Sequence, residues 1–214
     1  MNIYLMLITL IRFRAQSPTL ERVLTSLGAA VGACSEAITQ AKESRDPEFI
    51  ETVVEEECDV VENLIGAAFV AGQAEITGVI SPVMRLHKRA ATDGHILTST
   101  DGTKSGIMRL GTPVRPSLPY SHVEVINAFA NYFKHHDEWH VRWAALTGLA
   151  KQTADTIMAL GATEGSTGNL RKGIEVLGIA KKYADLVNVS GMVSDWANAV
   201  FTTYESELRR LGSI

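Results

Sequence analysis

Apolar residues recur every three or four positions along most of the chain, which is the spacing of one face of an α-helix. The first regular series starts after Pro18 and consists of Leu20, Leu24, Leu27, Val31, Cys34, Ile38 and Ala41. A second series follows a break near Asp46 and consists of Ile50, Val54, Cys58, Val61, Ile65 and Ala68. Both series alternate steps of three and four, and the connection between them is short. They therefore predict two long helices that form an antiparallel hairpin.

The apolar series continues beyond the hairpin, but Pro82 lies within it. Because proline lacks a backbone N–H and clashes with the preceding turn, we expect it to kink or divide this segment. Residues 93–118 are rich in Gly, Thr, Ser and Pro and predict a long loop. Inside that loop, the dipeptide Asp101-Gly102 stands between two pairs of apolar residues, which is typical of a small β-hairpin. A last long helix is expected over 189–211.

The densest group of polar, aromatic and basic residues lies between Pro119 and Trp139. Ser121, followed three positions later by Glu124, is a capping box and predicts the start of a helix. On this helix a polar stripe has spacings of three, four and four, and its members are Glu124, Asn127, Asn131 and His135. Asn and His are poorer helix formers than Glu, Lys, Gln or Arg, so their alignment indicates a hydrogen-bonding role. An ordinary surface stripe, or a polar layer against another helix, is the alternative.

Length and composition favour one soluble helical unit. The chain has 214 residues, of which 46% are hydrophobic and 21% charged. We predict an all-α fold, a helical bundle forming a single domain over 1–214, with an apolar N-terminal segment at 1–16. The apolar run in that segment is too short to span a bilayer, so no membrane association is expected. The two cysteines do not form a disulfide framework, which favours the cytoplasm.

The second predicted helix is strongly acidic, with Glu51, Glu55, Glu56, Glu57, Asp59 and Glu62. Such a run most often forms a solvated helix face. The spacing Glu56-x-x-Asp59 also resembles half of the paired acidic motif of all-α nucleotide pyrophosphohydrolases. That resemblance implies carboxylates that hold magnesium against a phosphate chain. The family also needs a Glu-Glu-x-x-Glu motif on the preceding helix, which here offers only Glu21 and Glu36.

The segment Ala130-Asn131-Tyr132-Phe133-Lys134-His135 resembles the Arg-Asn-x-x-x-His signature of HEPN-domain proteins. The resemblance implies a helical bundle, often dimeric, and in many members a metal-independent ribonuclease or toxin. Carried over, His135 is the catalytic acid or base, and Asn131 is the polar residue that orients it. The arginine of the signature is replaced by Ala130. Lys134, Arg142 or Arg171 would supply the missing charge only if the fold brings one of them close.

Two other patterns suggest ligand chemistry. The first is the group His135, His136, Asp137, Glu138 and His140. Neighbouring residues on a helix point in different directions, whereas a zinc site needs convergent ligands, so we expect no metal and no cofactor. The second is a Gly/Ser/Thr-rich loop at 161–168 that opens a helix carrying Arg171. Free amides at a helix start can bind phosphate, but the loop matches no phosphate-loop pattern, so plain capping is the favoured explanation.

Two classes of function stay open: a non-catalytic helical binding or dimerisation module, and a hydrolase of the ribonuclease or pyrophosphohydrolase type. The net charge of −4 and the pI near 5.9 argue against a general polyanion binder and leave room for a local basic site. We expect Asn127, Asn131 and His135 to be partly shielded in a cleft or a two-fold dimer contact. A homodimer would join two copies of His135 and Lys134 into a positive groove for RNA or another anion. The candidate binding residues are Asn127, Lys134, Arg142 and Arg171.

Overall fold

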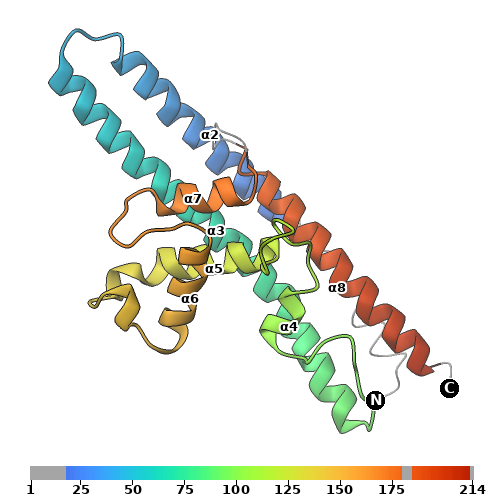
Figure 1. Ribbon diagram of the computed structural model, residues 1–214. Helices are drawn as coiled ribbons and strands as arrows, with labels where there is room; N and C mark the ends of the chain where they lie inside the picture. Colours follow the sequence, from blue (N-terminus) through green and yellow to red (C-terminus); the bar gives the residue numbers. More distant parts are fainter. Residues whose placement is uncertain (1–17, 180–184, 213–214) are drawn as a thin grey trace.

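A computed structural model describes residues 18–179 and 185–212, and every regular element in these ranges is helical (Figure 1). The α-helices are α2 (Pro18–Ala41), α3 (Pro47–Thr92), α4 (Lys104–Met108), α5 (His122–His135), α6 (Gly148–Ala159), α7 (Asn169–Val176) and α8 (Asn188–Gly212). Two short 3-10 turns are η1 (His136–Glu138) and η2 (Trp143–Ala145). The all-α prediction is therefore confirmed. The apolar N-terminal segment lies outside the described residues.

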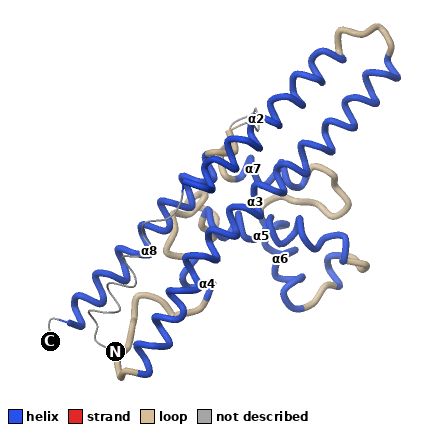
Figure 2. Tube along the Cα trace, turned by 180° about the vertical axis from the view of Figure 1, so that it is seen from behind, coloured by secondary structure: helices blue, strands red, loops and turns tan. Residues whose placement is uncertain are grey.

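The 46-residue helix α3 is the spine of the molecule. Helix α2 runs beside its first half and helix α8 beside its second half, so that the three helices form a long, narrow layer (Figures 1 and 2). Helix α5 packs against the middle of α3, and α6 and α7 pack on α5. One continuous hydrophobic core links all of these contacts. The polar stripe of α5 is therefore placed beside the centre of the spine.

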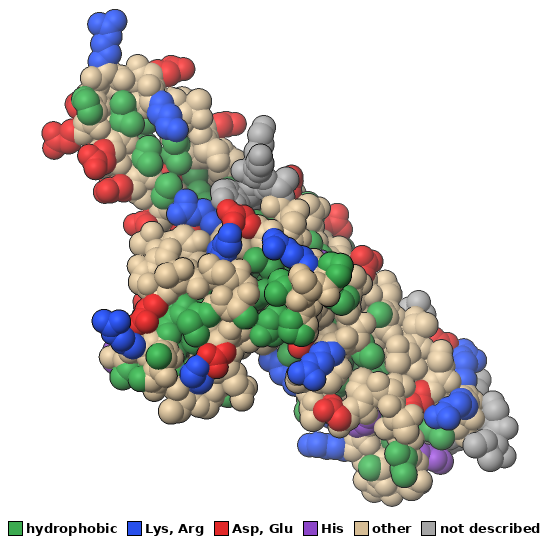
Figure 3. All heavy atoms as spheres, in the orientation of Figure 1, with side chains coloured by type: hydrophobic (Ala, Val, Ile, Leu, Met, Phe, Trp, Pro, Cys, Tyr) green, Lys and Arg blue, Asp and Glu red, His purple; other side chains and the backbone are tan. Residues whose placement is uncertain are grey.

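The predicted hairpin of α2 and α3 is present. Its central seam residues Leu24, Val31, Val61 and Ile65 are buried, with 0 to 7% of each residue exposed. The Asp46 carboxylate begins α3 by accepting a hydrogen bond of 3.1 Å from the backbone N–H of Glu48. Toward this turn the hairpin projects beyond the other helices, and acidic side chains are prominent on its surface (Figure 3). Val54, in this projecting part, is only half-buried.

Pro82 does not divide the long helix, so one of the two effects expected from the sequence, a division of the segment, is absent. Helix α3 continues through it from Pro47 to Thr92. Val79, Ile80, Val83 and Leu86, on both sides of the proline, are buried in the core. Because this burial stabilises both flanking turns, the helix tolerates the hydrogen bond that proline cannot donate.

The predicted β-hairpin is also wrong, since the second of its expected strands is helix α4. The turn itself exists: Gly102 adopts a φ of +70°, and Asp101 Oδ1 accepts a 2.9 Å hydrogen bond from the Thr103 N–H. Thr103 then caps α4, because its hydroxyl oxygen accepts a 3.0 Å hydrogen bond from the Gly106 N–H. Asx-turn and cap signals thus favour a helical turn over a strand. The described residues contain one isolated bridge, between 113 and 121, and no strand.

Helix α3 is long and apolar enough to cross a membrane, and it is the one such helix among the described residues. Half of its most apolar stretch, 50% by residue, is buried against the rest of the chain. Core helices of soluble proteins have the same properties, so length and composition alone do not place α3 in a bilayer.

Candidate functional site

The start and orientation of α5 follow from the capping box and the apolar face. Ser121 Oγ accepts a 3.3 Å hydrogen bond from the Glu124 N–H, and Glu124 Oε2 accepts a 2.9 Å bond from the Ser121 N–H. Val123, Ile126 and Phe129 are fully buried. With this face in the core, the polar stripe lies at the edge of the contact with α3 and α4.

Gln73 of α3 is the centre of a polar cluster on this edge. Its Nε2 donates to Asn131 Oδ1 at 2.8 Å and to Asn127 Oδ1 at 3.0 Å. Its Oε1 accepts a 2.7 Å hydrogen bond from Lys134 Nζ. Gln73 is only 8% exposed, so both ends of a buried amide are satisfied by residues of α5.

Lys104, at the start of α4, completes the cluster. Its Nζ donates to Asn127 Oδ1 at 2.7 Å. We call Gln73, Lys104, Asn127, Asn131 and Lys134 the lysine–amide site. The five residues come from α3, α4 and α5, so the site exists only when these three helices are in contact.

The orientation of each amide follows from the two lysines. An ammonium group can only donate, so Lys134 must face the oxygen of Gln73, and the Gln73 nitrogen must then face the asparagines. Asn127 and Asn131 therefore present their oxygens inward. Their Nδ2 groups have no acceptor among the described residues, and no buried side-chain nitrogen or oxygen there lacks a partner. The two Nδ2 groups are therefore open to solvent as free donors.

The lysine–amide site carries positive charge that no carboxylate of the described residues neutralises. Lys104 is exposed as a residue, but partial desolvation of its ammonium group by the surrounding helices lowers its pKa, and the nearby charge of Lys134 lowers this pKa further. In the described part of the chain neither lysine forms a salt bridge with a carboxylate. The outward groups of the site are two ammonium ions and two amide N–H₂ groups, which are all donors. Such a surface can bind an anion.

Helix α4 is short, and contacts with other helices hold it in place. Trp196 Nε1 of α8 donates to the carbonyl oxygen of Ile107 at 3.2 Å. Ser121 Oγ donates to the carbonyl oxygen of Met108 at 2.9 Å. Ile107 is fully buried. Lys104 is therefore attached to the core through the last turn of its own helix.

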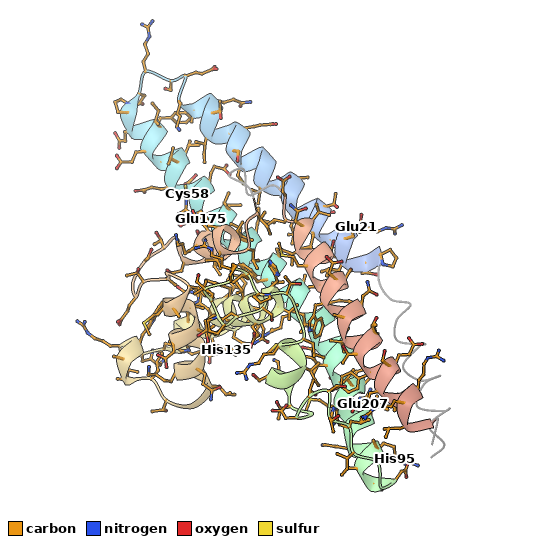
Figure 4. The ribbon with its side chains drawn as sticks, turned by 45° about the vertical axis from the view of Figure 1, so that its right-hand side comes forward. Glu21, Cys58, His95, His135, Glu175 and Glu207 are labelled. Atoms are coloured by element: carbon orange, nitrogen blue, oxygen red, sulfur yellow. The ribbon has the colours of Figure 1, made fainter. Side chains whose placement is uncertain are left out.

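A second polar cluster fixes the segment that leads into α4. Glu207 of α8, only 5% exposed, accepts hydrogen bonds from the backbone N–H and the hydroxyl of both Thr98 and Ser99 (Figure 4). Burial raises the pKa of Glu207, but these hydrogen bonds outweigh burial and make the net shift a lowering. The charged carboxylate therefore anchors the segment.

Next to it, Tyr204 Oη lies 2.6 Å from both His87 Nε2 and Thr100 Oγ1. Burial lowers the pKa of His87, which favours the neutral imidazole. Burial also raises the pKa of Tyr204 to about 12, so its hydroxyl stays protonated. These neutral groups join α3, α8 and the segment before α4.

The residues that carry the resemblance to HEPN-domain proteins lie in different environments. Asn127 and Asn131 are half-buried as expected, but the side chain of His135 is 50% exposed, and its Nδ1 lies 3.3 Å from Glu138 Oε2 (Figure 4). Ala130, at the position of the family's arginine, is fully buried in the core. A side chain at position 130 therefore points into the core.

Among the described residues, no hydrogen bond joins the other two candidate binding residues, Arg142 and Arg171, to the lysine–amide site. Arg171 Nε donates to Glu62 Oε1 at 2.6 Å, and Glu62 also accepts a 3.1 Å bond from the Leu170 N–H. Burial raises the pKa of Glu62, while Arg171 lowers it. Arg142 is exposed just before η2 and forms no side-chain hydrogen bond or ion pair with the described residues.

The acidic face of α3 and the Gly-rich loop have simpler roles. Glu51, Glu55, Glu56 and Asp59 are exposed on the projecting hairpin. In residues 18–179 and 185–212, no three or more His, Cys, Asp or Glu side chains are grouped so that they could hold a metal ion. The loop at 161–168 is organised by buried Asn169, whose Oδ1 accepts a 2.9 Å bond from the Thr163 N–H.

Two residues of the site, Gln73 and Lys104, were not predicted. Gln73 does leave a signal, because it is a polar residue inside the apolar series that continues from Phe69 to Ile76. Lys104 leaves none, because it stands in a segment without periodicity. Comparisons with protein-family models, curated protein sequences and solved structures found no significant match to this chain. Its function is therefore inferred from the site itself.

Proposed function

We propose that this protein is a helical binding module and that its ligand is an anion held at the lysine–amide site. The observation that carries the proposal is the double use of Gln73, which aligns two asparagines while accepting from Lys134. The buried amide thereby leaves the N–H₂ groups of both asparagines as free donors beside Lys134, and Lys104 adds a second ammonium group through Asn127. Asn127 and Lys134, both expected to bind a ligand, take part in it.

Charge supports the same proposal. Two ammonium groups that share one amide network repel each other, and no carboxylate in the described residues pairs with either of them. A bound anion would remove this repulsion and would accept the four free donors.

The contacts of the polar stripe on α5 favour binding over ribonuclease chemistry. The oxygen of Asn131 already accepts from Gln73, and the His135 ring faces Glu138. Ala130 supplies no charge and points into the core. These contacts leave donors in place for a ligand but do not bring an acid–base pair to a reacting group.

Titration calorimetry with sodium phosphate at neutral pH and low ionic strength tests the proposal. We expect saturable binding that weakens about tenfold or more in Lys104→Met and in Lys134→Met, since each loses one charged donor. Lys42→Met is the matched control, because Lys42 is an exposed lysine at the hairpin turn. The proposal fails if phosphate, sulfate and citrate all show no binding, or if both site variants bind as the control does.

A further inference from the structure

We infer that the anion is the dianionic group of a phosphate monoester. This inference rests on the proposed binding function and names its ligand class. The starting point is the number of charges at the lysine–amide site. Lys104 and Lys134 are both tied to the same amide cluster, through Asn127 and Gln73 respectively.

A single negative charge balances only one of these lysines. Carboxylates and phosphodiesters each carry one charge, whereas a phosphate monoester carries about −1.5 to −2 near neutral pH. The monoester therefore matches both ammonium groups at once. It also has three terminal oxygens, each of which can accept more than one hydrogen bond.

The types of donor group in the site also favour a phosphate monoester. They come from four separate side chains: Lys104 on α4, and Asn127, Asn131 and Lys134 on α5. No arginine hydrogen-bonds to this cluster in the described structure, so its donors are separate ammonium and amide groups rather than a planar guanidinium fork. Separate donors on two helices suit a tetrahedral group, whose oxygens point in different directions.

The positive charge is confined to a short part of the stripe. On one side of it Glu124 pairs with Arg109 at 3.6 Å, and on the other side His135 lies 3.3 Å from Glu138. Beyond the site, the charged groups at both ends of the stripe are therefore already paired with groups of opposite charge or with a histidine. Both lysines are exposed, so the organic part of a compact monoester can extend into solvent.

The test compares phenyl phosphate with phenyl sulfate, which have the same shape but carry different charges at pH 7.5. Calorimetry should show phenyl phosphate binding at least tenfold more tightly. The preference should disappear near pH 5, below the second phosphate pKa of about 6. Both compounds should lose affinity in Lys104→Met and Lys134→Met, and neither in Lys42→Met. The variant His135→Gln should keep the pH profile, which would exclude the exposed imidazole as its source.

The outcomes separate the two proposals. Equal affinity for phenyl phosphate and phenyl sulfate at pH 7.5, with both lost in the lysine variants, would overturn the monoester while leaving the anion site in place. Absence of binding by either compound and by inorganic phosphate would overturn both. Equal binding in wild type and the lysine variants would place any anion elsewhere on the protein and would also overturn both.

Discussion

Lys134 and Gln73 are joined by a 2.7 Å hydrogen bond from the ammonium Nζ to the amide Oε1. Because the ammonium group cannot accept, this contact fixes the direction of the Gln73 amide and, through it, the amides of Asn127 and Asn131. Lys104 imposes the same direction on Asn127. A cluster of neutral amides thereby acquires a polarity, with its acceptors inside and its donors outside.

The outward N–H₂ donor of Asn131 can be replaced with an acceptor without changing the shape of the side chain. Asn131→Asp retains an oxygen for Gln73 but replaces the free N–H₂ group with a charged acceptor. We expect phosphate binding to weaken at least tenfold, with no loss of thermal stability, because the new carboxylate lies next to Lys134. Asn198→Asp, an exposed change on α8, adds the same charge as a control. Phosphate affinity in Asn131→Asp equal to that in the control would contradict the outward orientation of Nδ2.

Gln73 should contribute to stability as well as to binding. Gln73→Leu leaves the two asparagine oxygens and Lys134 without their buried partner, which should lower the free energy of unfolding by about 1–3 kcal/mol. Urea denaturation followed by circular dichroism measures this change. Gln152→Leu, at an exposed position of α6, should leave stability within about 0.5 kcal/mol of wild type. An equally small effect at Gln73 would show that the amide network contributes no net stability.

Glu207 should make stability depend on pH in the acid range. Its folded-state pKa lies below the ordinary value, so its contribution is complete above about pH 4.5 and is lost as the pH falls through the folded-state pKa. Glu207→Gln should lower stability by about 1.5–3 kcal/mol at pH 7, because the amide N–H₂ cannot accept from Thr98 or Ser99.

Below pH 4 the difference between Glu207→Gln and wild type should become smaller, and Glu164→Gln in an exposed loop serves as the control. Thermal unfolding at a series of pH values gives the comparison. A difference that stays constant from pH 7 to pH 3 would mean that Glu207 does not act through its charge.

The hairpin seam gives a graded test of packing. Leu24 is fully buried, whereas Leu27 is only half-buried. Leu24→Ala should destabilise the protein by about 2–5 kcal/mol, and Leu27→Ala by less, because less apolar surface is lost. Chemical denaturation of the two variants measures both values. A larger loss at Leu27 would mean that the seam is rotated relative to the one described.

The features that sequence predicted best depend on neighbouring residues. The capping box of Ser121 and Glu124 links residues three positions apart. The seam of α2 and α3 repeats every three or four residues, and the turn at Asp46 is short. In each case the interacting groups lie within a few residues or in two helices that a short turn joins, so the pattern alone defines the contact.

The lysine–amide site could not be predicted in the same way. Gln73 lies 54, 58 and 61 positions from its partners on α5. Periodicity shows which face of a helix is apolar but not which helix covers it. Pro82 illustrates the same limit, because its effect on α3 is decided by burial on both sides rather than by local preference.

The most direct test of the anion site is the pKa of Lys104, measured by NMR from the ¹⁵N and ¹³C signals at the end of the side chain. Burial and the charge of Lys134 should hold this pKa below its ordinary value, and Lys134→Met should raise it. Saturating inorganic phosphate should also raise it, because a bound anion favours the charged ammonium. An ordinary pKa for Lys104 that responds neither to Lys134→Met nor to phosphate would contradict the proposed site.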